Sequence, residues 1–435
     1  MSASRQENVK WVDGLRGIAS LLVVLTHLTR AFDDDLFKPT SAEGASPRLL
    51  QLPFLRVLVQ GRIGVPIFSL VTGYVCALKP IRIYANGQQE KALVSITKSA
   101  FRRIPRLVLP ASIATIIIWV ICEFGGFSVT KHVASWWLIY TTPNRQSIVP
   151  SFLELCTNLI TTWTREWNVY EPNQWTLLPL LKGAFLVYVM LFATAYMKPK
   201  YRMMVEMALF VYYYIANDPE FGIHFFFGAF LCDLSQLPAY TDWIATRKWP
   251  GHILSPICIL IGLLFASYPE TKAEWMPWSN AMLSLSKYIF PPSHPDTPRF
   301  YTGLGLTFLA LGLHFSDHAK QVLSYKYLLW CGKNSFAVYL LHGTFLRTVL
   351  VWMLYGFVAP KDILNEDGSV HEAPHLELGS RWWFYLAVGM WFGVMYWAAN
   401  LWTTYVDAWC GRFTASLEKR TFHQEEEKSQ PLLPQ

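Results

Sequence analysis

Residues 11–28, WVDGLRGIASLLVVLTHL, set the architecture of the whole chain. A membrane-spanning helix needs about 20 consecutive, mostly apolar residues, and this stretch meets that requirement. It nevertheless carries Asp13, Arg16 and His27. Ionisable side chains inside a span usually face the protein interior or a water-filled cavity rather than lipid. The stretch therefore predicts a first transmembrane helix with a polar stripe that faces other parts of the protein.

The polar stripe follows from the spacing of its members. Arg16 and His27 are eleven residues apart, so at 3.6 residues per turn they lie within about 20° of the same helix face. Asp13 and Ser20, three and four residues from Arg16, extend that face. A rise of 1.5 Å per residue separates Arg16 from His27 by about 16 Å, roughly half the hydrocarbon thickness. We expect a polar path from one membrane edge toward the far leaflet.

The composition of the full chain agrees with a membrane protein. Of its 435 residues, 53% are hydrophobic, 16% are aromatic and 15% are charged, whereas about 25% are charged in an ordinary soluble protein. We therefore predict an all-α, polytopic bundle of about ten transmembrane helices in a membrane domain over residues 1–410, followed by a polar cytoplasmic tail over 411–435. The predicted spans are 14–32, 62–79, 105–123, 183–198, 202–217, 221–236, 252–269, 301–316, 334–358 and 382–408.

The charges of the connecting loops predict the orientation of the bundle. Residues 79–106 carry seven bases and one acid, and 198–202 carry three bases and no acid. In contrast, 217–221 holds two acids and no base, and 359–381 holds five acids and two bases. Because short cytoplasmic loops are enriched in Lys and Arg, this alternation places both termini in the cytoplasm.

The net charge of +7 arises from these short loops, so it indicates membrane orientation and not a nucleic-acid partner. The seven cysteines are scattered without a C-x-x-C pair. We therefore expect neither a disulfide framework nor a metal site.

His27 is a candidate general base. An imidazole with a pKa near 6.5 can accept a proton from a hydroxyl group at neutral pH. The alternative is a structural histidine that only hydrogen-bonds a neighbouring helix, and Arg16 can equally reach the membrane interface from a helix end. A second histidine favours chemistry: residues 330–342, WCGKNSFAVYLLH, predict a break at Gly332 and a new helix with His342 two turns inside the membrane.

Three further segments are less specific. In residues 64–74 the small side chains predict close helix packing, and Thr72 can donate a hydrogen bond into a central cavity. The basic residues of 79–106 can hold the phosphates of lipids or of a nucleotide-bearing cosubstrate, although topology alone explains them. The tryptophan-rich loop 124–182 fits either an interfacial anchor or the roof of a cavity.

Four motifs, in this order, resemble the acyltransferase family 3 of integral membrane enzymes, in its filamentous-fungal form. The first is residues 11–27, and the resemblance covers about residues 10–410. The others are Gly64-Val65 with Phe68 and Thr72-Gly73-Tyr74; Trp175-Thr176 with Lys182-Gly183; and Gly332 with Ser335-Phe336, Tyr339-Leu340 and His342.

This resemblance implies an O-acyltransferase that moves an acyl group, expected to be acetyl, from acyl-CoA to a hydroxyl of a small molecule such as a fungal secondary metabolite. Its catalytic histidine would be His27, with Arg16 as the motif arginine. No cofactor is expected to be bound permanently, and the enzyme would lie in the endoplasmic reticulum or another endomembrane. The residues implied in substrate binding are Asp13, Ser20, Thr72, Tyr74, Trp175, Ser335, Tyr339 and His342. Those implied in binding the acyl-CoA phosphates are Lys79, Arg82, Arg102, Arg103 and Arg106.

The sequence departs from the family pattern at two positions. Thr72 replaces the usual serine, which keeps the hydroxyl group. Leu180 stands where the central motif has a glutamate, five residues after Trp175. Either another acid takes over its role or activity is weak; the candidates are Glu154, Glu166 and Glu171.

Two other functions stay open at this point. A transporter or flippase would use the same polar path without chemistry, but the paired, broken spans typical of transporters are not seen. An inactive family member acting as a partner protein is kept open by Leu180. The acceptor, the acyl length, the particular membrane and the oligomeric state are not determined by the sequence.

Overall fold

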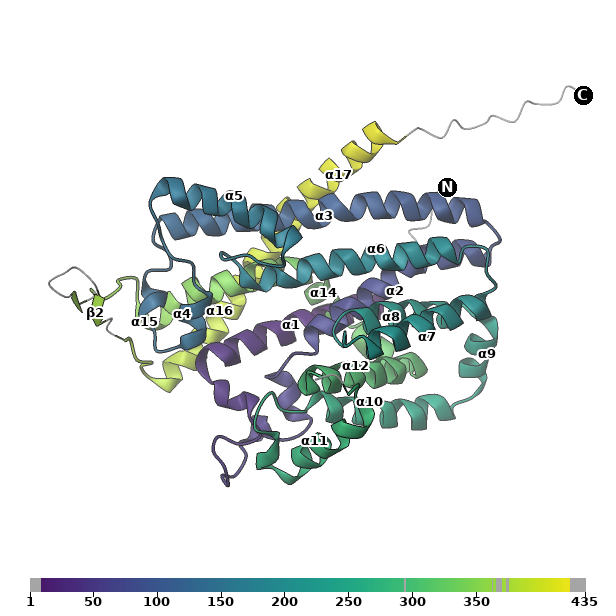
Figure 1. Ribbon diagram of the computed structural model, residues 1–435, viewed down its shortest axis with the longest axis horizontal. Coiled ribbons are helices and arrows are strands. Elements are labelled where there is room, and N and C mark those ends of the chain that lie inside the picture. Colours follow the sequence, from purple (N-terminus) through teal and green to yellow (C-terminus); the bar gives the residue numbers. More distant parts are fainter. Residues whose placement is uncertain (1–8, 293–294, 362, 365–369, 373–374, 423–435) are drawn as a thin grey trace, which may run out of the picture.

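The computed structural model describes residues 9–292, 295–361, 363–364, 370–372 and 375–422. Nearly all of this part is helical, and its long helices lie roughly along one direction (Figure 1). The exception is a short antiparallel hairpin of β1 (Ile363–Leu364) and β2 (Val370–Glu372). The all-helical architecture predicted from the sequence is confirmed.

The helices follow in this order: α1 (Lys10–Phe32), α2 (Gly64–Ala85), α3 (Gln89–Glu123), α4 (Trp136–Thr141), α5 (Ile148–Thr164), α6 (Leu177–Ala193), α7 (Pro199–Ile215), α8 (Gly222–Ser235), α9 (Pro238–Thr246), α10 (Ser255–Ala266), α11 (Pro277–Ile289), α12 (Thr297–Phe315), α13 (Asp317–Leu323), α14 (Lys326–Phe345), α15 (Val351–Tyr355), α16 (Arg381–Trp402) and α17 (Ala408–Thr421). Short 3₁₀ segments are η1 (Asp34–Phe37), η2 (Leu49–Gln51), η3 (Leu55–Leu58), η4 (Val129–His132), η5 (Pro172–Thr176) and η7 (Ala273–Trp275), and π-helical turns are η6 (Pro250–Leu254), η8 (Leu346–Leu350) and η9 (Thr403–Asp407).

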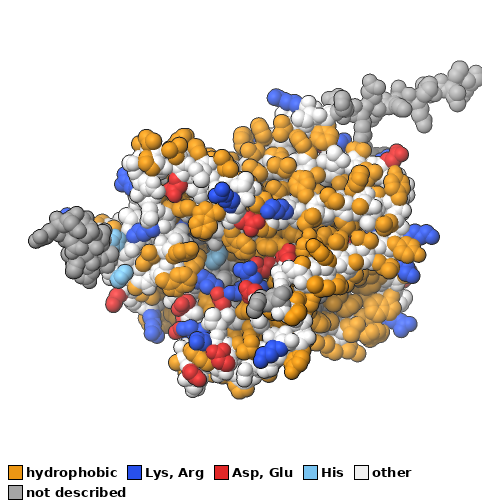
Figure 2. Space-filling view, viewed as in Figure 1, with side chains coloured by type: hydrophobic (Ala, Val, Ile, Leu, Met, Phe, Trp, Pro, Cys, Tyr) orange, Lys and Arg blue, Asp and Glu red, His pale blue; other side chains and the backbone are white. Residues whose placement is uncertain are grey.

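Six helical stretches are long and apolar enough to cross a membrane, or seven if one pair of helices bent by 80° is a single span. The six are Lys10–Phe32, Gly64–Ala85, Gln89–Glu123, Pro172–Ala193, Lys326–Tyr355 and Arg381–Thr421, and the bent pair is Pro238–Thr246 with Pro250–Ala266. Hydrophobic side chains cover much of the face shown in Figure 2. The chain is therefore a multi-pass membrane protein. Each of the ten predicted spans overlaps a helix, but a count of ten stays a prediction.

Helix α1 packs along α14 and also contacts α2. The first of these contacts depends on glycines. A Cβ atom on Gly332 would lie 1.9 Å from the carbonyl oxygen of Asp13, and one on Gly17 would lie 2.6 Å from that of Leu328. Small residues let two membrane helices approach this closely. The close contact sets α14 directly beside the polar stripe of α1.

The predicted helix break at Gly332 is wrong. Helix α14 runs without interruption through this position. Neither residue expected to cap a new helix does so: Asn334 donates to the carbonyl of Trp330 at 3.0 Å, and Ser335 to that of Gly332 at 2.8 Å, both within the same helix. Gly332 therefore serves close packing rather than helix termination.

The C-terminal helices complete the bundle. The π-helical turn η9 joins α16 to α17, and α17 lies against α3, where Arg102 pairs with Glu418 at 3.4 Å. The predicted boundary between membrane domain and tail at residue 410 falls inside α17. Residues 423–435 of the predicted polar tail lie outside the described residues.

Candidate active site

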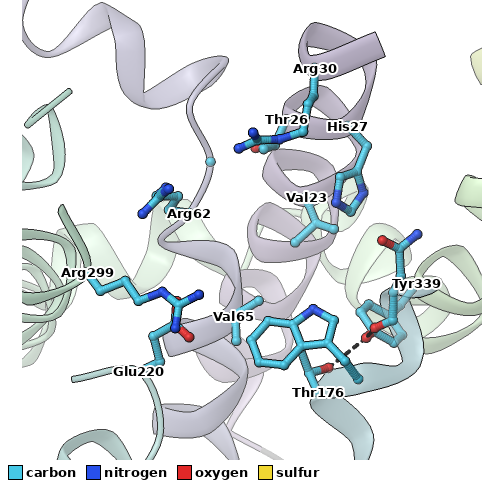
Figure 3. A pocket seen from close by; sticks show the side chains of 13 residues that line it. Val23, Thr26, His27, Arg30, Arg62, Val65, Thr176, Glu220, Arg299 and Tyr339 are labelled. Atoms are coloured by element: carbon cyan, nitrogen blue, oxygen red, sulfur yellow. Dashed lines mark hydrogen bonds and ion pairs between the residues drawn. The ribbon is translucent and has the colours of Figure 1, made fainter. Parts of the chain in front are cut away.

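A small cavity lies at the His27 end of the α1 stripe. Its volume is about 180 Å³, and we call it the His27 cavity. Figure 3 shows His27 beside this space, with Arg30, Arg62 and Arg299 around it. Pockets that hold whole drug-sized ligands have volumes of about 300–1,000 Å³, so this one suits the reacting end of a substrate. Its lining residues are Val23, Thr26, His27, Arg30, Gly61, Arg62, Val65, Asn173, Trp175, Thr176, Glu220, Arg299 and Tyr339.

A larger cavity of about 820 Å³ lies at the other end of the stripe, and we call it the basic cavity. Its cationic lining residues are Arg16, Lys79, Arg102, Arg103, Arg106 and Lys333. Asp407, on the π-helical turn η9, is the acidic side chain among those lining it. Arg103 donates to Thr72 Oγ1 at 3.3 Å, so the hydroxyl of α2 faces this cavity too. The arrangement suits a ligand with several negative charges.

The two cavities lie end to end along the same helices. On α1, Arg16 lines the basic cavity and His27 lines the other one. On α2 the order is reversed: Val65, near the helix start, lines the His27 cavity, and Lys79, near its end, lines the basic cavity. Tyr339 on α14 lines both. The polar path predicted from the spacing on α1 is thus divided into two compartments.

Two histidines meet where α1 passes α14. Nδ1 of His27 lies 2.8 Å from Nε2 of His342, and their rings are stacked with centroids 5.0 Å apart. Trp137, from the tryptophan-rich loop, also stacks on the His27 ring, with centroids 5.3 Å apart. The imidazole of His27 is therefore fixed in orientation by an indole and a second imidazole.

The hydrogen-bond partners determine where the protons sit in a neutral pair. Nδ1 of His342 faces two acceptors, the carbonyl oxygens of Val338 at 3.0 Å and Tyr339 at 2.9 Å, so it carries the proton. Nε2 of His342 then accepts from Nδ1 of His27. The remaining nitrogen of His27, Nε2, keeps its lone pair. A histidine that lines a cavity in this tautomer is ready to accept a proton there.

An asparagine supports this assignment. Nδ2 of Asn173 lies 2.7 Å from Oε1 of Glu171, which only accepts, so this atom is the amide nitrogen. The same nitrogen lies 3.5 Å from Nε2 of His342. A donor on that side is compatible with a lone pair on Nε2 and not with a proton.

Glu171 and Arg347 form a buried ion pair behind the histidines. Both side chains are 1% exposed, and Nη2 of Arg347 lies 2.8 Å from Oε2 of Glu171. Arg347 also donates to the carbonyls of Gly343 at 3.1 Å and Tyr170 at 2.9 Å, and Thr344 donates to Glu171 at 2.9 Å. The pair thereby joins α14 and the π-helical turn η8 to Tyr170 and Glu171, which directly precede η5. Asn173 lies in η5.

Comparison with known proteins identifies the family. The acyltransferase domain family matches residues 9–399, nearly the whole chain. This chain belongs to the acyltransferase 3 family. It is similar to the O-acetyltransferase PaAT-1 of Phomopsis amygdali, with 25% identity over 79% of this chain and 73% of that protein. It also resembles acyltransferase R4 of Phoma sp. (strain ATCC 20986 / MF5453) and acyltransferase clz18 of Cochliobolus lunatus, with 24% and 23% identity over 76% of this chain and 81% of each relative. No solved structure matches significantly.

The family resemblance inferred from the four motifs is thus confirmed, and the protein is a membrane acyltransferase. The structure also shows what stands near the position of the missing family glutamate. Leu180 itself lines the basic cavity. Of the three possible substitutes, Glu166 pairs with Lys182 at the surface and Glu154 bonds Gln146. Glu171 is the one beside the histidine pair.

Several residues predicted for the site of this acyltransferase do line a cavity. Thr72 and Ser335 face the basic cavity and Trp175 faces the His27 cavity, while His342 bonds His27 from behind. Four phosphate-binding candidates, Lys79, Arg102, Arg103 and Arg106, line the basic cavity.

Other predicted residues face elsewhere. Asp13 pairs with Arg16 at 3.7 Å, Ser20 donates to the carbonyl of Gly17 at 2.9 Å, and Tyr74 lies 3.3 Å from Ser235. Among the described residues, these and Arg82 are not part of either lining.

Sequence reasoning missed Asn173, Lys333, Arg347 and Asp407, and it included Trp137 only as part of the tryptophan-rich loop 124–182. Arg347 had a signal, because it is an ionisable residue within the predicted span 334–358. Asn173 had no such signal, because it is an uncharged residue outside the predicted spans.

The three arginines that line the His27 cavity are held in ion pairs. Glu270 binds Arg30 and Arg62, each at 2.7 Å, and Arg299 binds Glu220 at 3.3 Å and Asp296 at 3.1 Å. Burial raises the pKa of Glu270, but the two arginines lower it more, and its net pKa lies below 4.5. Burial raises the pKa of Glu220 beyond what Arg299 compensates. The arginines of this cavity are therefore paired with carboxylates.

We expect Glu270→Gln to lower the free energy of unfolding at pH 7 by about 1–2 kcal/mol, between the values for exposed and buried pairs. Because the folded pKa of Glu270 is depressed, its contribution is complete above pH 4.5 and is lost as pH falls through the folded pKa. Thermal unfolding in detergent from pH 7 to pH 3.5 measures this difference. Asp33→Asn, which breaks the exposed pair with Arg48, is the control and should change little. An equal loss in both variants at pH 7 would contradict the prediction.

Proposed function

We propose that this acyltransferase moves an acetyl group from acetyl-CoA to a hydroxyl of a small molecule, of the fungal secondary-metabolite class. The observation that carries the proposal is the contact between Nδ1 of His27, which lines a cavity, and Nε2 of His342, whose Nδ1 faces two carbonyl oxygens. From this geometry we infer that Nε2 of His27 keeps a free lone pair. Relatives named as an O-acetyltransferase and as acyltransferases, all fungal, support it.

In the proposed reaction, Nε2 of His27 takes the proton of the acceptor hydroxyl as its oxygen attacks the thioester carbonyl. The C–S bond of the tetrahedral intermediate then breaks, and the departing thiolate takes the proton back from His27. The products are the ester and CoA, so atoms and charges balance. The bond from Nδ1 to His342 stabilises the transient imidazolium and keeps Nε2 directed at the acceptor.

The donor is proposed to bind in the basic cavity. CoA carries a diphosphate and a further phosphate, and guanidinium groups bind phosphates through several N–H donors. Its pantetheine arm would extend from these phosphates toward Tyr339 and the His27 cavity. Arg16 would then hold the donor rather than act next to His27, since the two residues line different cavities.

The topology follows from the same assignment. We infer about ten spans with both termini in the cytoplasm. The alternating charges of the connecting segments support this number, and the orientation is supported by the Lys- and Arg-rich segment 79–106, whose Lys79, Arg102, Arg103 and Arg106 line the basic cavity. The acceptor would then reach His27 from the side of the membrane opposite to the cytoplasm, in an endomembrane such as the endoplasmic reticulum.

The direct test is release of CoA from acetyl-CoA by the purified protein with a panel of hydroxylated terpenoids and polyketides. Acceptor-dependent CoA release together with a product heavier by one acetyl group supports the proposal. Uptake of the same compounds into sealed proteoliposomes without CoA release would instead favour a transporter.

We expect Arg103→Gln to raise the KM for acetyl-CoA about tenfold and to change kcat little, because one charge-assisted hydrogen bond contributes about 1.5–3 kcal/mol. Steady-state kinetics with acetyl-CoA varied at saturating acceptor measures the effect. Lys91→Gln removes an exposed cation of the same helix, α3, that does not line the cavity, and it should leave KM unchanged. An unchanged KM in Arg103→Gln would argue against donor binding at this cavity.

A further inference from the structure

Tyr339 stands between the two cavities. It contributes to both linings although it is only 6% exposed. In the neighbouring segment, two consecutive residues line different cavities: Thr176 lines the His27 cavity and Leu177 lines the basic cavity. On α2, Val65 lines the His27 cavity and Phe68 lines the basic cavity, although they are less than one helical turn apart. The partition at this point is therefore about one side chain thick.

Hydrogen bonds hold the tyrosine in this position. Its hydroxyl donates to the carbonyl oxygen of Asn173, which only accepts. A phenol has one proton to donate, so the contact with Thr176 at 2.6 Å, the dashed line in Figure 3, is donated by the threonine. Phe68 contacts the tyrosine ring edge-on with centroids 6.2 Å apart. The ring is thus fastened to η5 at its hydroxyl and packed against α2 from the side of the basic cavity.

In this position, Tyr339 blocks the path between the two cavities that the proposed reaction requires. The base lines one cavity, whereas the cations that would hold the donor line the other. A thioester carbonyl that reaches His27 from the basic cavity has to pass the plane of Tyr339. We call the two hydrogen bonds of the Tyr339 hydroxyl, with Asn173 and Thr176, the latch. These bonds must therefore break each time an acyl group passes from the basic cavity to the His27 cavity.

We propose that Tyr339 is the gate of this acyltransferase: its latch keeps water and donor apart until acceptor is bound, and its ring restricts the acyl group to a short chain. The second part follows from space, because the acyl group and the reacting end of the acceptor must share a cavity of about 180 Å³. This inference rests on the proposed function and adds a specificity-determining residue to it.

Two variants separate the latch from the ring. Tyr339→Phe keeps the ring and removes both hydroxyl bonds, so it should raise CoA release from acetyl-CoA without acceptor about five- to tenfold and keep acetyl selectivity. Thr176→Val removes one of the two bonds and should shift the same hydrolysis in the same direction by less. Tyr339→Ala also removes the ring and should raise the rate with hexanoyl-CoA relative to acetyl-CoA at least tenfold.

Tyr84→Phe is the matched control. Tyr84 is likewise buried, at 7% exposure, and donates to the carbonyl of Leu191 at 2.9 Å, but it lines neither cavity. It should change neither hydrolysis nor acyl selectivity. If Tyr339→Ala fails to fold, the hydrolysis rates of Tyr339→Phe and Thr176→Val decide the question alone.

The outcomes distinguish this inference from the function on which it rests. Wild-type protein that transfers acetyl groups while every Tyr339 and Thr176 variant keeps wild-type hydrolysis and selectivity would overturn the gate and leave the function standing. Wild-type protein that releases no CoA with any acceptor would overturn the proposed function and the gate with it.

Discussion

Replacing His27 with alanine should lower kcat for acyl transfer about 10³-fold, within the range of about 10²–10⁴ that a positioned general base supplies. The loss follows because Nε2 of His27 is the nitrogen in the His27 cavity with a free lone pair, while His342 uses both nitrogens in hydrogen bonds. The KM for acetyl-CoA should stay nearly constant, because the proposed donor contacts lie in the other cavity. Initial rates of CoA release, with acetyl-CoA and acceptor varied in turn, separate the two parameters.

A second substitution distinguishes proton transfer from structural support. His27→Gln retains a side-chain amide that can donate to His342 but cannot accept a proton at neutral pH, so its kcat should fall as far as that of the alanine variant. His318→Ala, at an exposed histidine on α13, is the control and should behave as wild type. Activity in His27→Gln within tenfold of wild type would show that this histidine only supports the fold.

The features that the sequence predicted correctly are those written in hydropathy and spacing. Apolar windows located helices that overlap the ten predicted spans, but not α5 and α11. Ionisable residues within such windows drew attention to α1 and α14, which carry His27 and His342. The spacing rule placed Arg16 and His27 on one side of α1, and both do face cavities. These properties are local, because they depend on one helix and its surroundings.

The arrangement between helices was beyond reach of the same rules. Periodicity predicts which face of a helix a residue occupies, but not which residues of other helices lie opposite that face. The sequence therefore did not predict that Tyr339 divides the polar stripe into two cavities. The segment 124–182 was predicted to be a loop, but it contains α4 and α5. It places Trp137 on the ring of His27 and Asn173, held by Glu171, beside His342. At Gly332 the sequence predicted the end of a helix, and this prediction is wrong. A glycine that lets two helices touch cannot be told by sequence from one that ends a helix.

Substituting Glu171 with glutamine should destabilise the protein by about 3–5 kcal/mol, as is usual when one partner of a buried ion pair is removed. The guanidinium of Arg347 would remain buried, with only the carbonyl acceptors to bind it. We expect kcat to fall about 10²-fold as well, an effect of the size that misplacement within a site produces, because Glu171 also holds Asn173 beside His342. Thermal unfolding in detergent and CoA release from the folded fraction measure the two effects.

Two further variants separate stability from positioning. Glu171→Gln with Arg347→Met removes both charges, which is often neutral for stability at a buried pair, so the unfolding temperature should recover while kcat stays low. Asp233→Asn breaks a comparably buried pair with Arg202, whose side chains are 2% and 3% exposed. It should destabilise the protein as Glu171→Gln does and leave kcat of the folded fraction unchanged. Full activity in the double variant would mean that Glu171 contributes stability alone, and the histidine pair would then need no carboxylate behind it, consistent with Leu180 at the family's glutamate position.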